Sequence, residues 1–215
     1  MTVAAVDLAQ AVELSRTGDI WLFRGESTAD RAIRVVTNAP VNHVGMAVVL
    51  DDLPPMMWHA ELGQSLPDQW TGDHHRGVQL HLLTDAVLRW VTHYRQEAWL
   101  RQLTPEVGRR QEDALLRTIA RWNGTSFPTT ASLALRWTRG RLGRLRARPA
   151  GRHGRPAAAY CAEVVAVTYE AMGLLSPDRS PTWYDPGRFW SGDSLDLAPG
   201  WSLSGEIPVR VDAVR

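Results

Sequence analysis

Hydrophobic and polar residues alternate in several short segments of the chain, and each segment is bounded by residues that favour turns. This pattern is typical of strands that are buried on at least one face. We therefore predict strands at residues 19–23, 41–50, 56–62, 77–82 and 206–211. The second and third of these flank Asp51-Asp52-Leu53-Pro54-Pro55, which has turn composition, so they are expected to form a hairpin.

Apolar residues at helical spacing fill other parts of the chain. They predict helices at residues 5–16, from Ser27 onwards, at 104–122 and at 161–173. Residues 84–90 are expected to form a short helix or turn, and residues 92–103 fit either a strand or a helix. Strands that follow one another through short turns indicate an antiparallel sheet with helices on one side, which is an α+β fold.

The length and composition indicate one domain. The chain has 215 residues, of which 44% are hydrophobic, so it can bury a substantial core without disulfides or metal ions. We expect a single domain over residues 1–215. The N-terminal segment lacks a basic start followed by a long apolar run, and no apolar stretch approaches about 18 residues. A cytoplasmic protein is therefore expected, and the sequence implies no cofactor.

The chain contains one cysteine, Cys161, and it stands at the predicted start of a helix. The free N–H groups of a helix N-terminus and the positive end of its dipole favour a thiolate over a thiol. We therefore expect an accessible thiol of low pKa that can act as a nucleophile. The alternative is a small hydrophobic core residue, which is the commoner role of a free cysteine.

Two histidines are the candidate partners of this thiol. His43 opens a predicted strand and is the candidate general base. The hairpin places His59 on the neighbouring strand, where it can bond one imidazole nitrogen of His43 and leave the other nitrogen facing the thiol. Glu61 points to the same face as His59, because the two residues are two positions apart in a strand. Either residue can therefore orient His43.

Four short blocks carry a family resemblance. They are Gly18-Asp19-Ile20, Asn42-His43-Val44-Gly45-Met46-Ala47, Trp58-His59-Ala60 and Tyr160-Cys161-Ala162-Glu163-Val164. In this order they resemble the circularly permuted branch of the NlpC/P60 papain-like hydrolases, the YiiX/YebB-like group. The resemblance implies a permuted papain-like fold, with Cys161 as the nucleophile, His43 as the general base and His59 as the orienting residue. Glu61 remains the alternative, because many members carry an acidic residue in the third role.

The same resemblance implies a function, with alternatives. A hydrolase of this group would cleave an amide or ester bond of a small molecule, peptide or lipid through an acyl-thioester intermediate. The lecithin:retinol acyltransferase-like proteins share the order of the blocks, so a lipid acyltransferase or phospholipase is one alternative, and a non-enzymatic binding module is another. The residues expected to line a substrate pocket are Asn42, Trp58, Tyr160, Trp183 and Tyr184.

The basic charge of the chain is concentrated in one segment. Ten arginines and no acidic residue lie between Asp113 and Glu163. The part from Arg136 to Arg155 interleaves arginines with leucines and a tryptophan, which suits an anionic membrane surface. The alternative is a solvated, loop-like insertion at residues 136–159. No nucleic-acid-binding motif accompanies the charge, so no nucleic acid partner is expected.

One polar loop raises the question of a metal ion. Asp73, His74 and His75 could join His59 and Glu61 as ligands. Their spacing matches no established zinc pattern, and no cysteine ligand accompanies them. No metal site is expected, and the loop is predicted to line the mouth of the active site.

Overall fold

The computed structural model describes residues 4–126, 160–193 and 195–211. The arginine-rich segment from Arg136 to Arg155, and with it the predicted insertion at 136–159, lies outside the described residues. Among the helices within the described ranges, none is long and apolar enough to cross a membrane.

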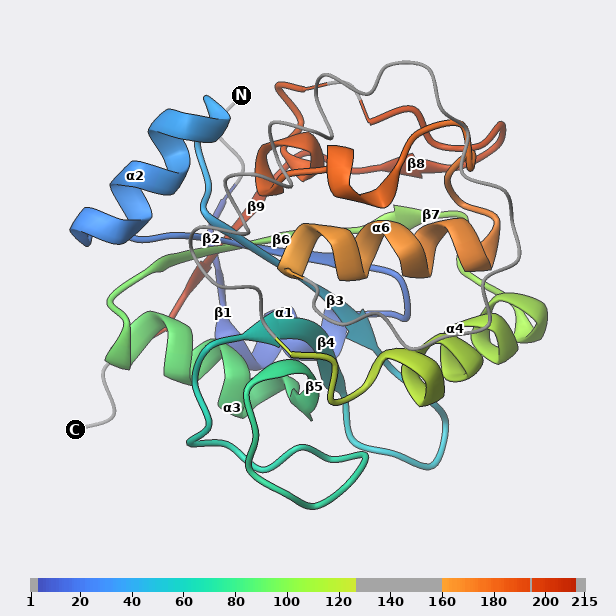
Figure 1. The fold of residues 1–215 in the computed structure, drawn as a ribbon, viewed down its shortest axis with the longest axis horizontal. Helices are drawn as coiled ribbons and strands as arrows, with labels where there is room; N and C mark the ends of the chain where they lie inside the picture. Colours follow the sequence, from blue (N-terminus) through green and yellow to red (C-terminus); the bar gives the residue numbers. More distant parts are fainter. Residues whose placement is uncertain (1–3, 127–159, 194, 212–215) are drawn as a thin grey trace.

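A mixed sheet of seven strands forms the centre of the fold (Figure 1). In spatial order its strands are β1 (Val6–Asp7), β9 (Ile207–Arg210), β6 (Glu97–Arg101), β2 (Ile20–Arg24), β3 (His43–Val48), β4 (Met56–Glu61) and β5 (Gly77–Leu82). Neighbouring strands are antiparallel except β1 and β9, which run parallel. A separate pair joins β7 (Leu103–Thr104) to β8 (Ser202–Leu203).

Most of the described helices pack against this sheet. The α-helices are α1 (Leu8–Leu14), α2 (Thr28–Thr37), α3 (Leu83–Leu88), α4 (Arg109–Trp122) and α6 (Cys161–Met172). A π-helical turn, η1 (Arg89–His93), continues α3, and two 3₁₀ turns, η2 (Pro181–Trp183) and η3 (Pro186–Phe189), follow α6. Figure 1 shows α4 and α6 side by side on one face of the sheet.

Helices cover both faces of the sheet, so the prediction of helices on one side is wrong. The core on one face joins Leu22, Met46 and Trp58 to residues of α4 and α6. The core on the other face joins Trp21 and Met57 to residues of α1, α3 and η1. Adjacent strand residues point to opposite faces, and both sets are apolar here, so each face needs a cover.

Most predicted elements occur near their expected positions. The hairpin of β3 and β4 is confirmed, as are strands near 19–23, 77–82 and 206–211 and the helix from Cys161 to the left-handed Gly173. Ser27 caps α2 and pairs with Asp30 in a capping box. The helix expected from Thr104 begins only at Arg109, because Thr104 pairs as a strand with Ser202.

Candidate active site

Cys161 is the first residue of α6, and its side chain is buried. Backbone N–H groups of Val44, Ala162 and Cys161 itself approach the sulfur and favour its thiolate. Burial outweighs them and raises the pKa of the Cys161 thiol to about 11. The prediction of an accessible thiol with a low pKa is therefore wrong, because loss of hydration opposes the charge more than the helix N-terminus favours it.

His43 is the first residue of β3, and it is also buried. Its ring stacks on the indole of Trp90, with 3.8 Å between ring centroids and 12° between the planes. Its Nε2 atom lies 3.1 Å from Nδ1 of His59, so the structure brings these two predicted residues together. Burial lowers the pKa of His43 to about 3, so the imidazole is neutral at physiological pH.

The contact between His43 and His59 is the first of three in a buried row. Nε2 of His59 lies 3.0 Å from Nδ1 of His81, on strand β5. Nε2 of His81 lies 3.0 Å from Oε1 of Gln79, two residues before it on the same strand. Burial also lowers the pKa of His59 and of His81, the latter to about 4. All three imidazoles are therefore neutral, with one N–H and one lone pair each.

Gln79 sets the proton positions along this row. Its amide nitrogen donates to the carbonyl oxygens of Gly63 and Gly77, at 3.2 and 3.4 Å, so its oxygen faces His81. An amide oxygen only accepts, so Nε2 of His81 carries the proton and Nδ1 of His81 carries the lone pair. Nε2 of His59 therefore carries a proton and donates to Nδ1 of His81. Nε2 of His43 in turn carries a proton and donates to Nδ1 of His59. The row leaves Nδ1 of His43 with a free lone pair.

Glu61 faces the same row but does not hydrogen-bond His43. Its Oε1 atom accepts a hydrogen bond of 2.8 Å from the Tyr94 hydroxyl. Its Oε2 atom is buried, accepts no hydrogen bond and lies 3.8 Å from both Nε2 of His59 and Nδ1 of His81. Burial raises the pKa of Glu61, against the opposing effects of the Tyr94 hydrogen bond and the Arg89 charge.

The thiol and the histidine row approach β3 from opposite faces. Cys161 belongs to the core under α4 and α6, whereas His43 lies against Trp90 of η1. Both lie near the start of β3, where His43 pairs with β2 and the pairing with β4 has not yet begun. The sulfur contacts the N–H of Val44, next in sequence to His43. No hydrogen bond joins Cys161 to His43, both of which the structure describes.

The predicted pocket residues have structural contacts. Asn42 is buried, accepts from the Gly25 N–H at 2.7 Å and donates to Asp30 at 3.0 Å. Trp58 is fully buried and donates to Thr168 of α6 at 3.0 Å. The Tyr160 hydroxyl donates to the carbonyl of Tyr184 at 2.7 Å, which connects the residue before the thiol to the aromatic segment at residues 183–190.

Two arginines make cation–π contacts with Trp183 in this aromatic segment. Trp183 is partly exposed and lies edge-on to the buried Tyr184. The guanidinium groups of Arg179 and Arg188 each lie 4.2 Å from the Trp183 ring. Trp183 is partly exposed, whereas the other predicted pocket residues are buried, so it is the pocket candidate best placed to meet a ligand.

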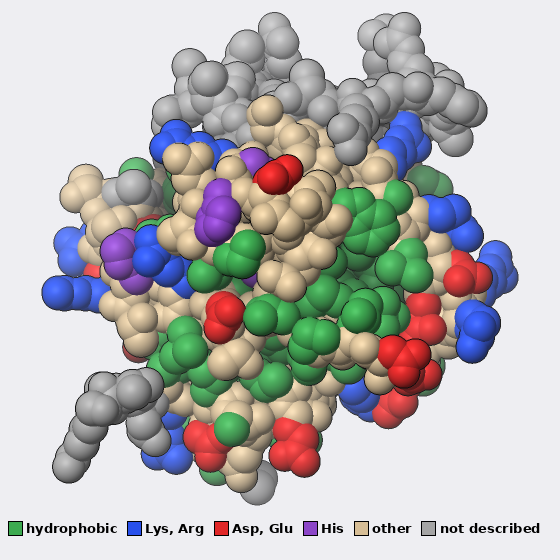
Figure 2. Space-filling view, turned by 90° about the horizontal axis from the view of Figure 1, so that it is seen from below, with side chains coloured by type: hydrophobic (Ala, Val, Ile, Leu, Met, Phe, Trp, Pro, Cys, Tyr) green, Lys and Arg blue, Asp and Glu red, His purple; other side chains and the backbone are tan. Residues whose placement is uncertain are grey.

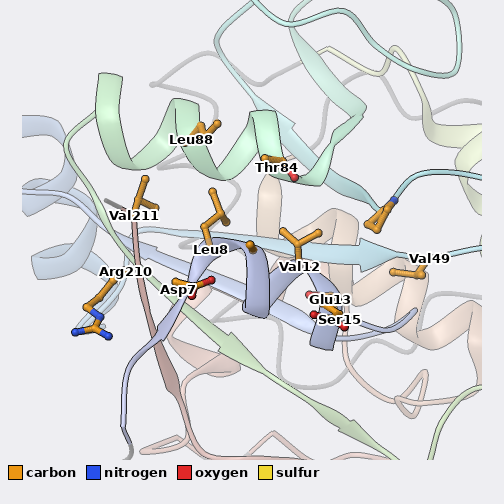
Figure 3. Close-up of a pocket in the computed structure, with 12 residues that line it drawn as sticks. Asp7, Leu8, Val12, Glu13, Ser15, Val49, Thr84, Leu88, Arg210 and Val211 are labelled. Carbon is orange, nitrogen blue, oxygen red and sulfur yellow. The ribbon is translucent and has the colours of Figure 1, made fainter. Parts of the chain in front are cut away.

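A surface groove lies on the opposite side of the sheet from the thiol. Its volume is about 720 Å³, and its walls come from α1, α3 and the end of β9, with Leu8, Val12, Leu88 and Val211 among the apolar residues (Figure 3). The molecule seen from below shows hydrophobic side chains gathered across the middle of that view (Figure 2). Neither Cys161 nor His43 lines this groove.

Sequence reasoning missed Gln79, His81 and Trp90. Gln79 and His81 occupy alternate positions of a strand that was correctly predicted, so they had to share one face. Register was the missing information: His59 pairs with Gln79, and Met57 with His81. Trp90 lies in the segment predicted as a short helix or turn, and its partner His43 is distant in sequence.

Comparison with known proteins adds little to this geometry. No family model and no curated protein matches the chain. The chain is similar to a solved structure described as the metalloprotein yiiX from Escherichia coli O157:H7, DUF1105, with 20% sequence identity and a TM-score of 0.45. The similarity covers 73% of this chain and 65% of that chain, so it spans less than two thirds of the yiiX protein. At this level the likeness carries no argument about chemistry.

Proposed function

We propose that the chain is a cysteine hydrolase that cleaves an amide or ester bond. The observation that carries the proposal is the row from Gln79 to His43, which leaves a lone pair on Nδ1 of His43. Nδ1 is on the main-chain side of the imidazole, and the adjacent N–H of Val44 contacts the Cys161 sulfur. In this proposal a base of fixed tautomer, one residue from the N–H that contacts the buried thiol, supplies the proton acceptor that nucleophilic catalysis requires.

The chemistry starts from a neutral pair. As Cys161 attacks the substrate carbonyl, its proton moves to Nδ1 of His43, so no free thiolate is needed beforehand. The N–H of His43 Nε2 donates to His59, which stabilises the imidazolium formed at that moment. His43 then gives the proton to the leaving group, and an acyl thioester forms at Cys161. Water, deprotonated by His43, cleaves the thioester and restores the thiol.

The N–H groups around the sulfur have a second role in this proposal. Those of Val44 and Ala162 approach Sγ from β3 and from the first turn of α6. They are the candidate donors for the negative oxygen of the tetrahedral intermediate. The N-terminus of α6 adds its positive dipole end to the same place.

The third position of the triad is assigned to His59 in this proposal. His59 hydrogen-bonds His43, whereas Glu61 faces Tyr94 and the far side of the row. The motif blocks and their order support a permuted NlpC/P60-like domain of the YiiX-like group over residues 1–215. A lipid substrate and a membrane role for Arg136 to Arg155 stay predictions, as does the lecithin:retinol acyltransferase-like alternative.

Covalent labelling tests the proposal. The protein is treated with a peptidyl chloromethyl ketone or a long-chain acyl chloromethyl ketone, and adducts are followed by intact-mass spectrometry. We expect one adduct, at Cys161, and none in Cys161→Ala. His43→Gln should slow labelling by about 100-fold, because a positioned base contributes at least that much. The exposed His74 provides the matched control, and His74→Gln should label like the wild type.

Two outcomes would count against the hydrolase. Equal labelling rates in His43→Gln and wild type would show that His43 is not the base. If neither chloromethyl ketone labelled Cys161 until the protein was unfolded, Cys161 would be a core residue. The second result would favour the non-enzymatic binding module. Faster labelling by the peptidyl reagent would indicate a peptide substrate, and faster labelling by the long-chain acyl reagent would indicate a lipid substrate.

A further inference from the structure

Three buried ligand atoms converge beside the histidine row. They are Nε2 of His59, Nδ1 of His81 and Oε2 of Glu61, all within 4.8 Å of one another. The two nitrogens are 3.0 Å apart, and each is 3.8 Å from the carboxylate oxygen. A triangle with these sides has its centre about 2.1 Å from each corner, which equals the usual bond length of zinc to nitrogen or oxygen.

The carboxylate oxygen in this cluster lacks a partner. Glu61 is 4% exposed, and its Oε2 atom accepts no hydrogen bond. A buried carboxylate oxygen without a donor is costly, and a cation at the centre of the triangle would remove that cost. The other oxygen of Glu61 is already held by Tyr94, so Oε2 is fixed toward the two histidines.

The second polar atom of each residue in the cluster is held by a neighbouring residue, as is usual for metal ligands. Metal-bound histidines usually donate their second N–H to an oxygen or another acceptor, which fixes the ring. Nε2 of His81 faces Oε1 of Gln79, and Nδ1 of His59 faces Nε2 of His43. Each of the three proposed ligands therefore has one atom at the centre and its other polar atom held by a neighbour.

We propose that His59, Glu61 and His81 bind one divalent transition-metal ion, zinc by the chemistry of two imidazoles and a carboxylate. Such a set leaves a fourth position of the tetrahedron to solvent. The sequence prediction of no metal site considered His74 and His75 instead of His81. Those two residues lie in the 62–76 loop, and neither belongs to the cluster.

Metal binding would also act on the proposed catalytic base, a consequence that rests on the proposed function. A metal takes the lone pairs of both His59 Nε2 and His81 Nδ1, so the proton between them must leave. The proton of His59 then resides on Nδ1 and is donated to Nε2 of His43, and the proton of His43 resides on its Nδ1. The number of protons on the histidines is unchanged, but His43 has lost the Nδ1 lone pair that acts as the base in the proposed function. The metal-loaded form is therefore the inactive form.

Direct metal binding tests the site without using activity. Purified protein, stripped with a chelator, is titrated with Zn²⁺ against a competing indicator and with Co²⁺ by absorption spectroscopy. We expect one equivalent of each and a tetrahedral Co²⁺ spectrum. Glu61→Gln and His81→Gln should each weaken Zn²⁺ binding by about 100-fold or more, since each removes a direct ligand. His74→Gln and Cys161→Ala should bind like the wild type.

Several results would overturn the site. The site would be wrong if the wild type did not bind Zn²⁺, or if both Glu61→Gln and His81→Gln bound Zn²⁺ with wild-type affinity. It would also be wrong if His74→Gln lost Zn²⁺ binding. Circular dichroism confirms that each variant is folded, and two different ligand variants guard against one that is not. Zinc binding that survives in Cys161→Ala also separates this site from the hydrolase proposal, because the site stands even if Cys161 proves unreactive.

A second measurement tests the link to the base. Zn²⁺ at saturation should slow chloromethyl ketone labelling of wild-type Cys161 by about 100-fold, as expected for His43→Gln, because both remove the general base. The same Zn²⁺ concentration should leave labelling of Glu61→Gln unchanged relative to its own metal-free rate. Equal slowing in Glu61→Gln would show that zinc acts on the thiol directly and would overturn the link.

Discussion

The imidazole of His43 lies flat against the indole of Trp90, with 3.8 Å between their centroids. Trp90 is 8% exposed and lies in the π-helical turn η1, and Tyr94, the residue after this turn, donates to Glu61. The indole therefore limits rotation of the His43 ring and excludes water from one of its faces. A π-helical turn at such a place is typical of functional sites.

Replacing Trp90 with leucine should affect reactivity beyond its effect on stability. The smaller side chain leaves the His43 ring free to rotate, so we expect chloromethyl ketone labelling of Cys161 to slow by about 10-fold. The free energy of unfolding should fall by about 2 kcal/mol through the cavity that remains. Labelling is measured under conditions where both proteins are folded. An unchanged labelling rate would reduce Trp90 to a packing role.

The Cys161 thiol should ionise with difficulty in the folded protein. Its pKa is raised to about 11 by burial, so the folded state disfavours the thiolate. The rate of iodoacetamide alkylation should stay low between pH 7 and pH 9 and should rise on unfolding in urea, where the thiol titrates near about 8.5. The rate is followed by mass spectrometry across pH. An inflection below 8.5 in the folded protein would show that Cys161 and His43 form an ion pair.

The histidine row predicts a ranking of variants. His59→Ala removes the partner of His43 Nε2, so it should slow labelling less than His43→Gln but more than Glu61→Gln in metal-free protein. Labelling rates are compared after chelation. A severe effect of Glu61→Gln with a mild effect of His59→Ala would transfer the orienting role to Glu61.

Gln79 should affect the labelling rate of Cys161, although it lies at the far end of the histidine row from His43. Gln79→Leu removes the acceptor that fixes the three tautomers, so a fraction of His43 will carry its proton on Nδ1. We expect the labelling rate to fall several-fold. The ¹⁵N chemical shifts of His43 should move from one tautomer toward a mixture, which a purely structural role would not produce. Unchanged shifts would show that the row does not set the tautomers.

Glu170, on α6, should give a pH-dependent stability. Burial raises its pKa from 4.5 to about 7, so the folded state holds the proton more tightly than the unfolded state. Its stabilising contribution is complete below about pH 4.5 and is lost as the pH rises through about 7. Urea unfolding should show Glu170→Gln gaining stability relative to wild type across that interval. A difference that stays constant with pH would contradict this.

Local patterns in the sequence predicted the local structure. The hairpin from His43 to Glu61 follows from two apolar runs around an Asp- and Pro-rich turn, and α6 follows from apolar spacing that ends at Gly173. The meeting of His43 with His59 depends only on that hairpin, so it could be predicted as well. These features involve residues that are close in the sequence.

Features that depend on distant segments could not be predicted. The row beyond His59 needs the register of β4 against β5, which brings His81 and Gln79 behind it. The pKa of Cys161 is raised because the thiol is buried, and that burial depends on segments distant in sequence. The helix start, which the sequence does show, has only the opposite effect of lowering this pKa. The positions of the Cys161 sulfur and the His43 imidazole on opposite faces of β3 likewise follow from the packing of α6 and η1.

The place of β9 in the sheet has a consequence for synthesis of the protein. β9 is the last described strand, yet it lies between β1 and β6, pairing Val209 with both Val6 and Ala98. On the ribosome, β6 must therefore wait with an unpaired edge until residues 207–210 emerge, and β1 has no partner in the sheet before then. A nascent chain of this protein therefore offers an open strand edge from the emergence of β6 until the emergence of β9. Chaperone contact with the β6 edge is expected to end when β9 is released.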